Sequence, residues 1–203
     1  NAVLGDIVTD TVKTCMLGTA PLVEAVAARL SEEARPRPLV VDPVMVATSG
    51  DRLVDDKAVQ AIRSDLVPGA RLVTPNAPEA EVLTGKSVET VDGQRRAAEQ
   101  LLELGAHGAL VKGGHVGGDV IVDVLQTTTG EWLFEGPRIE TTSPHGTGCT
   151  LASACAALLA QGESVPLSVE RARQYLRGAI ENAPGFGRGH GPVGHGWLLN
   201  EER

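Results

Sequence analysis

A glycine-rich loop, Gly146-Thr147-Gly148, stands directly before an apolar segment with helical character. Glycine lets the backbone turn sharply and approach a ligand closely. The free N–H groups at a helix start, together with the positive end of the helix dipole, form a natural anion site. The pattern therefore predicts a place for a phosphate or a phosphoryl group in transfer. A glycine turn that only starts a helix is the structural alternative, which this loop alone leaves open.

Cys149 follows this loop, within what should be the first turn of the helix. The helix dipole should lower the pKa of a thiol there and increase its thiolate fraction. Cys149 is therefore a candidate base, or an activating hydrogen-bond partner, for a substrate hydroxyl. The alternative is a buried structural cysteine, which is the commoner role of a lone cysteine. We expect Cys155, in the middle of the helix, and Cys15, inside an expected strand, to be core residues of that kind.

Three oxygen-bearing residues form a candidate metal site. Asn76 and Glu79 lie three residues apart at a strand-to-helix junction, so they share one face of the first helical turn. Mg²⁺ keeps most of its waters and needs few protein oxygens, so these two side chains could hold its hydration shell near nucleotide phosphates. A helix-capping pair is the alternative. Asp42, just past an apolar strand, must be hydrogen-bonded, paired or close to a cation.

Lys112 lies between an apolar strand and Gly113-Gly114, a position that suits a phosphate clamp. A lysine at a strand end that reaches water is the alternative. The chain has no G-x-x-x-x-G-K-[ST] loop, and its "GGHVGG" segment is too loosely placed to be a dinucleotide fingerprint. Any phosphate chemistry must therefore use another cradle.

Apolar runs ended by Gly, Pro or Asn alternate with helical patterns along the chain, as in a parallel sheet covered by helices on both faces. Strands are expected over 11–17, 38–45, 71–76 and 108–114, and an antiparallel edge pair over 119–126 and 131–140. Helices are expected after Thr19 and over 58–70, 97–102, 150–161 and 169–180. Ligands of parallel sheets bind at the carboxyl ends of the strands. Asp42, Asn76 and Lys112 each follow one of the expected strands.

Composition excludes several classes of function. The net charge is −8, from 18 basic and 26 acidic residues, and only five residues are aromatic, so a nucleic-acid partner is not expected. No apolar run reaches the roughly 18 residues that span a bilayer, so we expect no membrane association and a cytoplasmic protein. Three cysteines without a CxxC spacing indicate neither a disulfide framework nor a zinc site. The length fits one α/β domain.

Six segments in order resemble the hydroxymethylpyrimidine and phosphomethylpyrimidine kinases of thiamine biosynthesis, members of the ribokinase-like superfamily. They are "VKTCML", "VVDPVMVATSGDRL", "VTPNAPEAEVLTG", "LVKGGH", "PHGTGCTLASA" and "GRGHGPVGH". Any one is weak, but the six together span nearly the whole chain. The resemblance implies an α/β fold of the ribokinase-like type, a three-layer sandwich of a mostly parallel sheet with helices on both faces.

The same resemblance implies roles for individual residues. Gly146, Thr147 and Gly148 match the anion hole, Cys149 the catalytic-base position beside the substrate, and Lys112 a phosphate-contacting lysine. The implied magnesium residues are Asn76, Glu79 and Asp42. The implied nucleotide side comprises Asp42, Thr74, Asn76, Lys112, Gly114 and Gly148, and Met16 matches a residue beside the pyrimidine pocket.

The implied reaction is ATP- and Mg²⁺-dependent phosphorylation of 4-amino-5-hydroxymethyl-2-methylpyrimidine and then of its monophosphate. A homodimer is expected, because relatives are often dimers. Two alternatives stay open, a pyridoxal kinase of the same cysteine-bearing group and a non-catalytic ATP-binding remnant.

Two departures bear on the choice between these alternatives. Cys15 stands where the family usually has glycine, which could narrow the substrate pocket. The family's N-terminal, substrate-covering part is not found in residues 1–203, which we otherwise expect to be a single kinase domain. The roles of His190 and His195 are left open.

Overall fold

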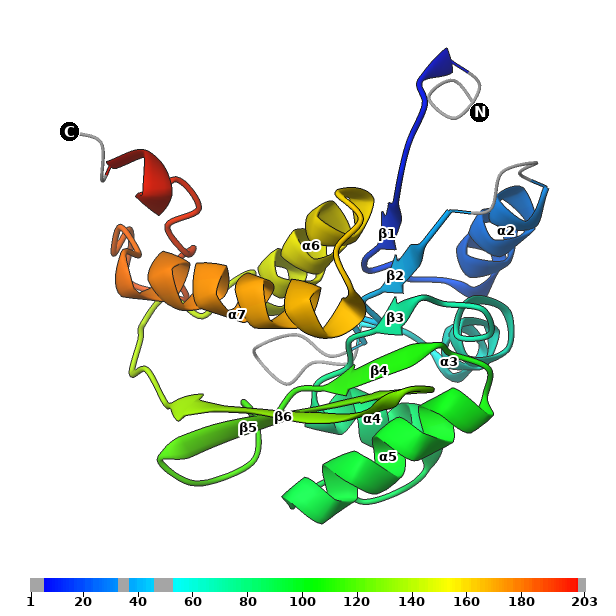
Figure 1. Ribbon diagram of the computed structural model, residues 1–203, viewed down its shortest axis with the longest axis horizontal. Helices are drawn as coiled ribbons and strands as arrows, with labels where there is room; N and C mark the ends of the chain where they lie inside the picture. Colours follow the sequence, from blue (N-terminus) through cyan, green and yellow to red (C-terminus); the bar gives the residue numbers. More distant parts are fainter. Residues whose placement is uncertain (1–5, 33–36, 46–52, 201–203) are drawn as a thin grey trace.

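The computed structural model describes residues 6–32, 37–45 and 53–200, and all structural statements below concern these residues (Figure 1). Its centre is a six-stranded sheet in the order β1-β2-β3-β4-β5-β6. The strands are β1 (Val12–Thr14), β2 (Leu39–Val41), β3 (Leu72–Val73), β4 (Gly108–Val111), β5 (Val120–Thr127) and β6 (Gly130–Pro137). The first four are parallel, whereas β5 and β6 pair antiparallel at one edge. The expected mostly parallel sheet with an antiparallel edge pair is confirmed.

Helices cover both faces of this sheet. They are α2 (Ala20–Ser31), α3 (Asp56–Ala61) with its π-helical continuation η1 (Ile62–Leu66), α4 (Ala77–Thr84), α5 (Val91–Glu103), α6 (Thr147–Ala160), α7 (Val165–Glu181) and the 3₁₀ turn η2 (Trp197–Asn200). In Figure 1, α6 and α7 lie on one side of the sheet and α4 and α5 on the other. The expected three-layer arrangement is therefore confirmed.

Alternation along the strands builds two separate cores. Val40, Leu72 and Leu110 pack with the apolar faces of α6 and α7. Their neighbours Val41, Val73 and Val111 pack with α2, α3, α4 and α5 on the opposite face. Because the strands follow one another in sequence order, right-handed crossovers put every connecting helix on the same face. The chain must therefore return with α6 and α7 to cover the other face.

The strands are shorter than the sequence pattern suggests. The expected strand 38–45 ends at Val41, and the expected strand 71–76 is reduced to Leu72–Val73. Proline at 43 and 75 lacks the N–H that a ladder needs, so pairing stops before each of them. The first strand likewise ends at Thr14 rather than Leu17, which leaves Cys15 and Met16 outside the sheet. Part of the "VVDPVMVATSGDRL" segment, residues 46–52, lies outside the described residues.

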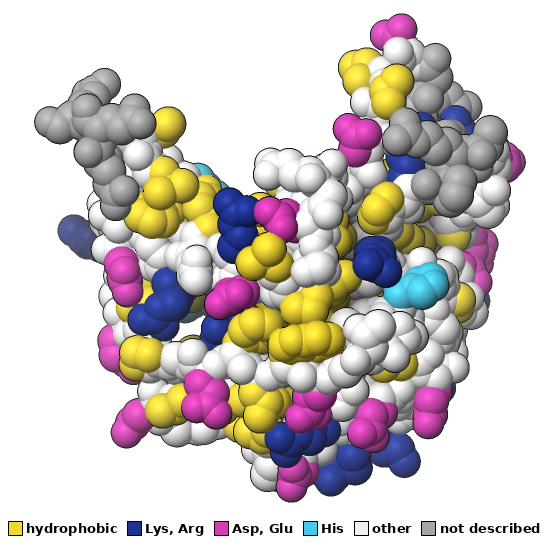
Figure 2. All heavy atoms as spheres, in the orientation of Figure 1, with side chains coloured by type: hydrophobic (Ala, Val, Ile, Leu, Met, Phe, Trp, Pro, Cys, Tyr) yellow, Lys and Arg dark blue, Asp and Glu magenta, His cyan; other side chains and the backbone are white. Residues whose placement is uncertain are grey.

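Two segments project from the body of the molecule. Figure 2 shows the chain before β1 and the C-terminal chain around η2 rising on either side of α6 and α7. Both carry exposed apolar side chains, among them Val8 and Leu199. Across the described parts of the chain, no helix is both long and apolar enough to cross a bilayer.

The turn after β4 is fixed by buried polar side chains. Asp123 of β5 accepts a hydrogen bond from the Gly113 N–H at 2.7 Å and also pairs with Arg173 of α7 at 2.7 Å. The Gln94 amide of α5 donates to the carbonyls of Val111 and Val122 at 2.9 and 2.8 Å. This arrangement leaves no room for a side chain at Gly113, whose added Cβ would overlap the Val122 carbonyl.

We therefore expect Gly113→Ala to lower the free energy of unfolding by at least about 2 kcal/mol, because the overlapping atom belongs to the backbone and cannot rotate away. Gly114→Ala is the matched control, since a Cβ there meets nothing within 4 Å. Thermal or urea unfolding of both variants measures the difference. Equal stabilities of the two variants would contradict this account of the turn.

Candidate active site

The carboxyl ends of three strands bring a carboxylate and two ammonium groups together. Asp42, directly after β2, is buried, with only 1% of its side chain exposed. Its Oδ2 lies 3.3 Å from Lys13 Nζ of β1, and its Oδ1 lies 3.7 Å from Lys112 Nζ after β4. Burial lowers the pKa of Lys13, but the Asp42 carboxylate and the nearby sulfurs of Cys149 and Cys15 together outweigh it, and the pKa is raised. Asp42 thus has the pairing that its position requires, and the trio carries one net positive charge.

The ladder of the parallel sheet fixes this trio. Thr14 pairs with Val41, and the Asp42 N–H donates to the Thr14 carbonyl at 3.2 Å. Asn76 and Lys112 form an isolated parallel bridge, in which the Lys112 N–H donates to the Pro75 carbonyl at 2.9 Å. The backbone, rather than side-chain packing, therefore sets where Asp42 and Lys112 stand.

The start of α6 closes over this trio. Gly146 is the N-cap residue with φ +83°, a left-handed conformation that favours glycine, and the helix begins at Thr147 rather than at the expected Thr150. A Cβ added to Gly148 would lie 3.1 Å from Lys112 Nζ, so the ammonium group lies against this glycine. Within the described chain, the N–H groups of Gly148 and Cys149 have no hydrogen-bond acceptor. Two free amides therefore lie beside a lysine.

The expectation for Cys15 is wrong. It is not a core residue inside a strand; it is exposed just beyond the end of β1. Its Sγ lies 3.3 Å from the Sγ of Cys149, which is half-buried. The two sulfurs and the Asp42 carboxylate all lie within 4.8 Å of one another. Cys155 is fully buried in the α6–α7 core, as expected.

The expected lowering of the Cys149 pKa is also wrong. Burial, the hydrogen bond with Cys15 and the negative charge of Asp42 raise the pKa of Cys149 to about 12, although Lys13 acts in the opposite direction. The helix dipole acts only at the first turn and is worth a fraction of a kcal/mol to about 2 kcal/mol. It is outweighed here by desolvation and a nearby carboxylate. Cys149 is therefore a neutral thiol at pH 7 in the unliganded chain.

Asn76 and Glu79 form a complete capping box at the start of α4. The Glu79 N–H donates to Asn76 Oδ1 at 2.9 Å, and the Asn76 N–H donates to Glu79 Oε2 at 2.8 Å. The other Glu79 oxygen accepts from the Met45 N–H at 3.2 Å. The helix-capping role that the sequence left open for this pair is therefore present in the structure. Only the remaining lone pairs of the Glu79 carboxylate are available to a hydrated cation.

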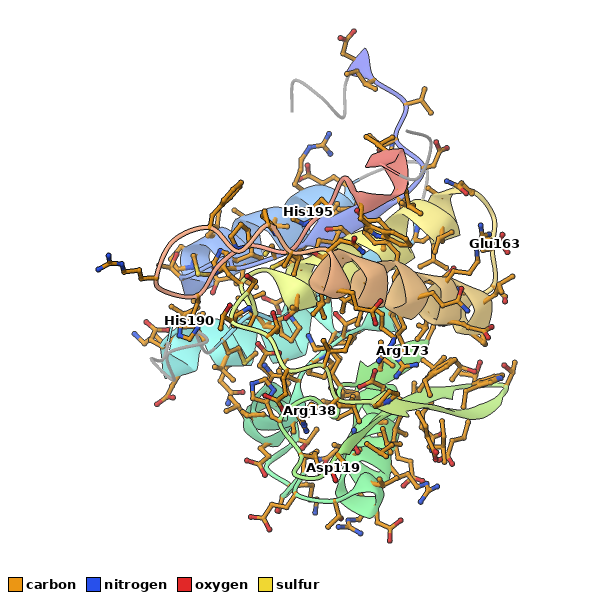
Figure 3. The ribbon with its side chains drawn as sticks, turned by 90° about the vertical axis from the view of Figure 1, so that its left-hand side faces the viewer. Asp119, Arg138, Glu163, Arg173, His190 and His195 are labelled. Carbon is orange, nitrogen blue, oxygen red and sulfur yellow. The ribbon has the colours of Figure 1, made fainter. Side chains whose placement is uncertain are left out.

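Arg138 holds the glycine-rich segment that follows Lys112. Its guanidinium donates to the carbonyls of Gly114, Val116 and Gly118 at 2.8, 2.7 and 3.0 Å. Figure 3 shows Arg138 near Asp119, whose carbonyl accepts from the Arg138 N–H at 2.8 Å. The rigid fork of the arginine matches several carbonyls at once. The segment after Lys112 therefore has a defined path.

The C-terminal glycine-rich loop contacts the same helix start. His195 Nε2 lies 3.0 Å from the hydroxyl of Thr150, next to Cys149, and the His195 carbonyl accepts from the Tyr175 hydroxyl at 2.7 Å. Figure 3 shows His195 on the loop that runs along α7. His190 is exposed. His195 thus ties the loop to α6, a role that sequence reasoning left open.

Sequence reasoning missed Lys13 and Arg138 as neighbours of the site. A signal existed for Lys13, which lies one residue before the end of β1 and pairs with Val40, two residues before Asp42, so the two side chains could be expected near the same sheet edge. No comparable signal pointed to Arg138, which follows the last strand of the edge pair. Met16 is exposed beside Cys15, and Thr74 is buried after β3.

Comparison with known proteins fits this geometry. Residues 1–194 match the family model described as phosphomethylpyrimidine kinase. The chain belongs to the phosphomethylpyrimidine kinase family. It is 46% identical over 200 residues to the hydroxymethylpyrimidine/phosphomethylpyrimidine kinase of Streptomyces coelicolor, covering 98% of this chain and 73% of that protein. It is 48% identical over 195 residues to the thiamine biosynthesis bifunctional protein ThiED of Geobacter sulfurreducens, covering 96% of this chain but 40% of that protein.

The similar solved structures include pyridoxal kinases. The pyridoxal kinase of Staphylococcus aureus in complex with ADP superposes with a TM-score of 0.89 at 30% identity, over 97% of this chain and 72% of that one. The expected ribokinase-like fold of this phosphomethylpyrimidine kinase family member is confirmed.

The charges around Cys149 predict opposite effects of two substitutions on its reactivity. Asp42→Asn removes the carboxylate that raises the pKa of Cys149, so alkylation of Cys149 by iodoacetamide at pH 8 should become several-fold faster. Lys13→Met removes the ammonium that opposes the rise, so alkylation should become slower. Mass spectrometry with fragmentation measures the adduct at Cys149. Circular dichroism verifies folding, and a change in the same direction for both folded variants would argue against this electrostatic account.

Proposed function

We propose that this chain is the catalytic part of an ATP-dependent kinase that phosphorylates 4-amino-5-hydroxymethyl-2-methylpyrimidine and then its monophosphate. The observation that carries the proposal is the place of the Lys112 ammonium, between the buried Asp42 carboxylate and Gly148 at the start of α6. That arrangement suits a phosphoryl group in transfer. The S. coelicolor relative is a hydroxymethylpyrimidine/phosphomethylpyrimidine kinase, which supports the substrate, and the ADP complex of the S. aureus pyridoxal kinase supports ATP as the donor.

The chemistry is an in-line displacement at the terminal phosphorus of ATP. The substrate hydroxyl oxygen forms the new bond to phosphorus while the bond to the ADP oxygen breaks, and ADP leaves. The N–H groups of Gly148 and Cys149, which have no acceptor within the described chain, and the Lys112 ammonium neutralise charge on the transferring group; the Thr147 N–H donates to the Pro144 carbonyl instead. Cys149, in its thiolate form, accepts the hydroxyl proton at its sulfur. Positioning and charge stabilisation supply most of the catalysis. The reaction therefore does not require Cys149 to be ionised in the free chain.

The residues present fit a hydrated magnesium ion. Asp42 Oδ2 is buried and, apart from its ion pair with Lys13 at 3.3 Å, has no partner within the described chain, so it can serve as a hard oxygen ligand, directly or through water. Asn76 and Glu79, whose oxygens cap α4, would contact only the waters of the ion. When bound with ATP, Mg²⁺ would offset charge on the phosphates. We also propose that Thr74 and Gly114 contact the nucleotide and that Met16 lies beside the pyrimidine substrate.

Cys149→Ala should impair the first phosphorylation more than the second. In the first reaction the nucleophile is a hydroxyl that must lose its proton, whereas in the second it is already an anionic phosphate. Separate steady-state assays with the pyrimidine and with its monophosphate measure the two losses, for which about 10²-fold and less than tenfold are expected for proton transfer. Comparable losses in both steps would indicate a purely positional role for Cys149.

The raised pKa also predicts a pH dependence of the first step. Because the pKa of Cys149 is about 12, the thiolate fraction increases with pH throughout the neutral and mildly alkaline range. The kcat/KM for the hydroxymethyl substrate should therefore rise between about pH 7 and pH 9, and that for the monophosphate should rise less. In Cys149→Ala the additional slope of the first step should vanish. A slope that persists in this variant would assign the proton to another group.

Pyridoxal is the second candidate substrate. The pyridoxal kinase of S. aureus superposes on this chain with a TM-score of 0.89. The phosphomethylpyrimidine kinase of Clostridium difficile superposes less closely, with a TM-score of 0.77 at 34% identity over 88% of this chain and 72% of that one. We expect the full-length protein to have the higher kcat/KM for the pyrimidine, in line with its 46% identical relative. Assays with both acceptors under one set of conditions measure the preference. Mg·ATP binding without turnover of either acceptor would favour the ATP-binding remnant. A homodimer and a cytoplasmic location stay predictions.

A further inference from the structure

Two thiols from distant parts of the chain meet in the candidate site. Cys15 Sγ, just beyond β1, lies 3.3 Å from Cys149 Sγ in the first turn of α6, although the residues are 134 positions apart. We propose that Cys15 and Cys149 are an oxidisable pair whose disulfide reversibly blocks the acceptor side of the site. The disulfide itself depends only on this geometry, whereas its effect on catalysis rests on the proposed function.

The accessibility of the two sulfurs is unequal in a way that suits oxidation. Cys15 is exposed and can meet an oxidant from solution, while Cys149 is half-buried directly behind it. Cys155 is fully buried in the other core and cannot compete for either partner.

A disulfide fits the local charge better than a metal ion does. Cys15, Asp42 and Cys149 together offer two sulfurs and an oxygen within 4.8 Å, a set that a soft cation could use. However, the ammonium groups of Lys13 and Lys112 lie 3.3 and 3.7 Å from the Asp42 carboxylate and would repel such a cation when no nucleotide phosphates are bound to offset their charge. A disulfide is neutral and leaves these ion pairs in place.

The reaction with hydrogen peroxide balances in two steps. The Cys15 thiolate attacks peroxide, an S–O bond forms as the O–O bond breaks, and the hydroxide released takes up the thiol proton as water. The Cys149 sulfur then attacks the Cys15 sulfenic sulfur, the S–S bond forms, and the S–O bond breaks to release a second water. In sum, two thiols and one peroxide give one disulfide and two waters, and a dithiol reductant reverses the modification.

The test treats the chain of residues 1–203 with hydrogen peroxide and counts its thiols in denaturant. Two of the three thiols should be lost and should return with dithiothreitol. Trypsin leaves Cys149 and Cys155 on one peptide, residues 139–171, and Cys15 on residues 14–29. The peptide map is therefore made on Cys155→Ala, where only Cys149 can be joined to Cys15. We expect an unreduced digest to contain these two peptides linked within one chain.

Kinase activity is followed in the same samples, each relative to its untreated value. The unsubstituted chain and Cys155→Ala should lose activity in step with the linked peptide and regain it with dithiothreitol. Cys15→Ser should lose much less at the same peroxide dose, because its Cys149 has no partner. Linkage only between chains, oxidation to sulfinic acid without a linked peptide, or equally fast inactivation of Cys15→Ser would overturn the proposal.

Two further outcomes separate this proposal from the proposed function. A linked peptide in a protein that phosphorylates neither acceptor before treatment would support the disulfide and refute the kinase assignment. An active kinase that never forms the linked peptide would refute the disulfide alone. Two results would refute the proposal that the disulfide blocks the site. One is full activity with the linked peptide present, and the other is inhibition that needs added Zn²⁺ and is reversed by a chelator.

Discussion

The candidate site depends on one buried carboxylate shared by two lysines. Asp42 is almost completely shielded from water, so its charge is tolerable only because Lys13 and Lys112 lie beside it. Removing either lysine would leave the buried Asp42 carboxylate with a single ion-pair partner, and removing Asp42 would leave two ammonium groups without their shared carboxylate. These residues come from the ends of β1, β2 and β4, so the ion-pair trio also joins three strands at the edge where the sheet must be open to a ligand.

This local charge differs in sign from that of the whole chain. The protein carries a net charge of −8, yet the trio has one positive charge in excess, and the free amides of Gly148 and Cys149 add the positive end of α6. The local positive charge attracts a phosphate to this position, whereas the negative charge of the rest of the protein disfavours anions elsewhere on the surface. The same excess explains why a second cation in the site would need its own anionic ligands, as a nucleotide's phosphates would supply.

Much of the fold and part of the site could be predicted from the sequence, for identifiable reasons. Apolar runs ended by Pro43 and Pro75 marked buried parallel strands, and the rule that strand ends share one edge brought Asp42, Asn76 and Lys112 together. The contact between Cys15 and Cys149 could not be predicted from the sequence, because it depends on where β1 ends and on where the first turn of α6 lies relative to it. The Arg138 contacts depend on loop carbonyls, for which side-chain patterns carry no signal.

The wrong expectation for the Cys149 pKa has the same origin. Sequence shows the position of a thiol in a helix, and hence its dipole, but not the depth of burial or the carboxylate and second thiol that face it. The three effects that raise the pKa all arise from tertiary contacts across the sheet edge. A thiol kept neutral in the free chain reacts slowly as a nucleophile. Anionic phosphates bound nearby would raise this pKa further, so loss of the Cys149 proton in the complex requires the positive charges of Lys13, Lys112 and a bound Mg²⁺ to outweigh them.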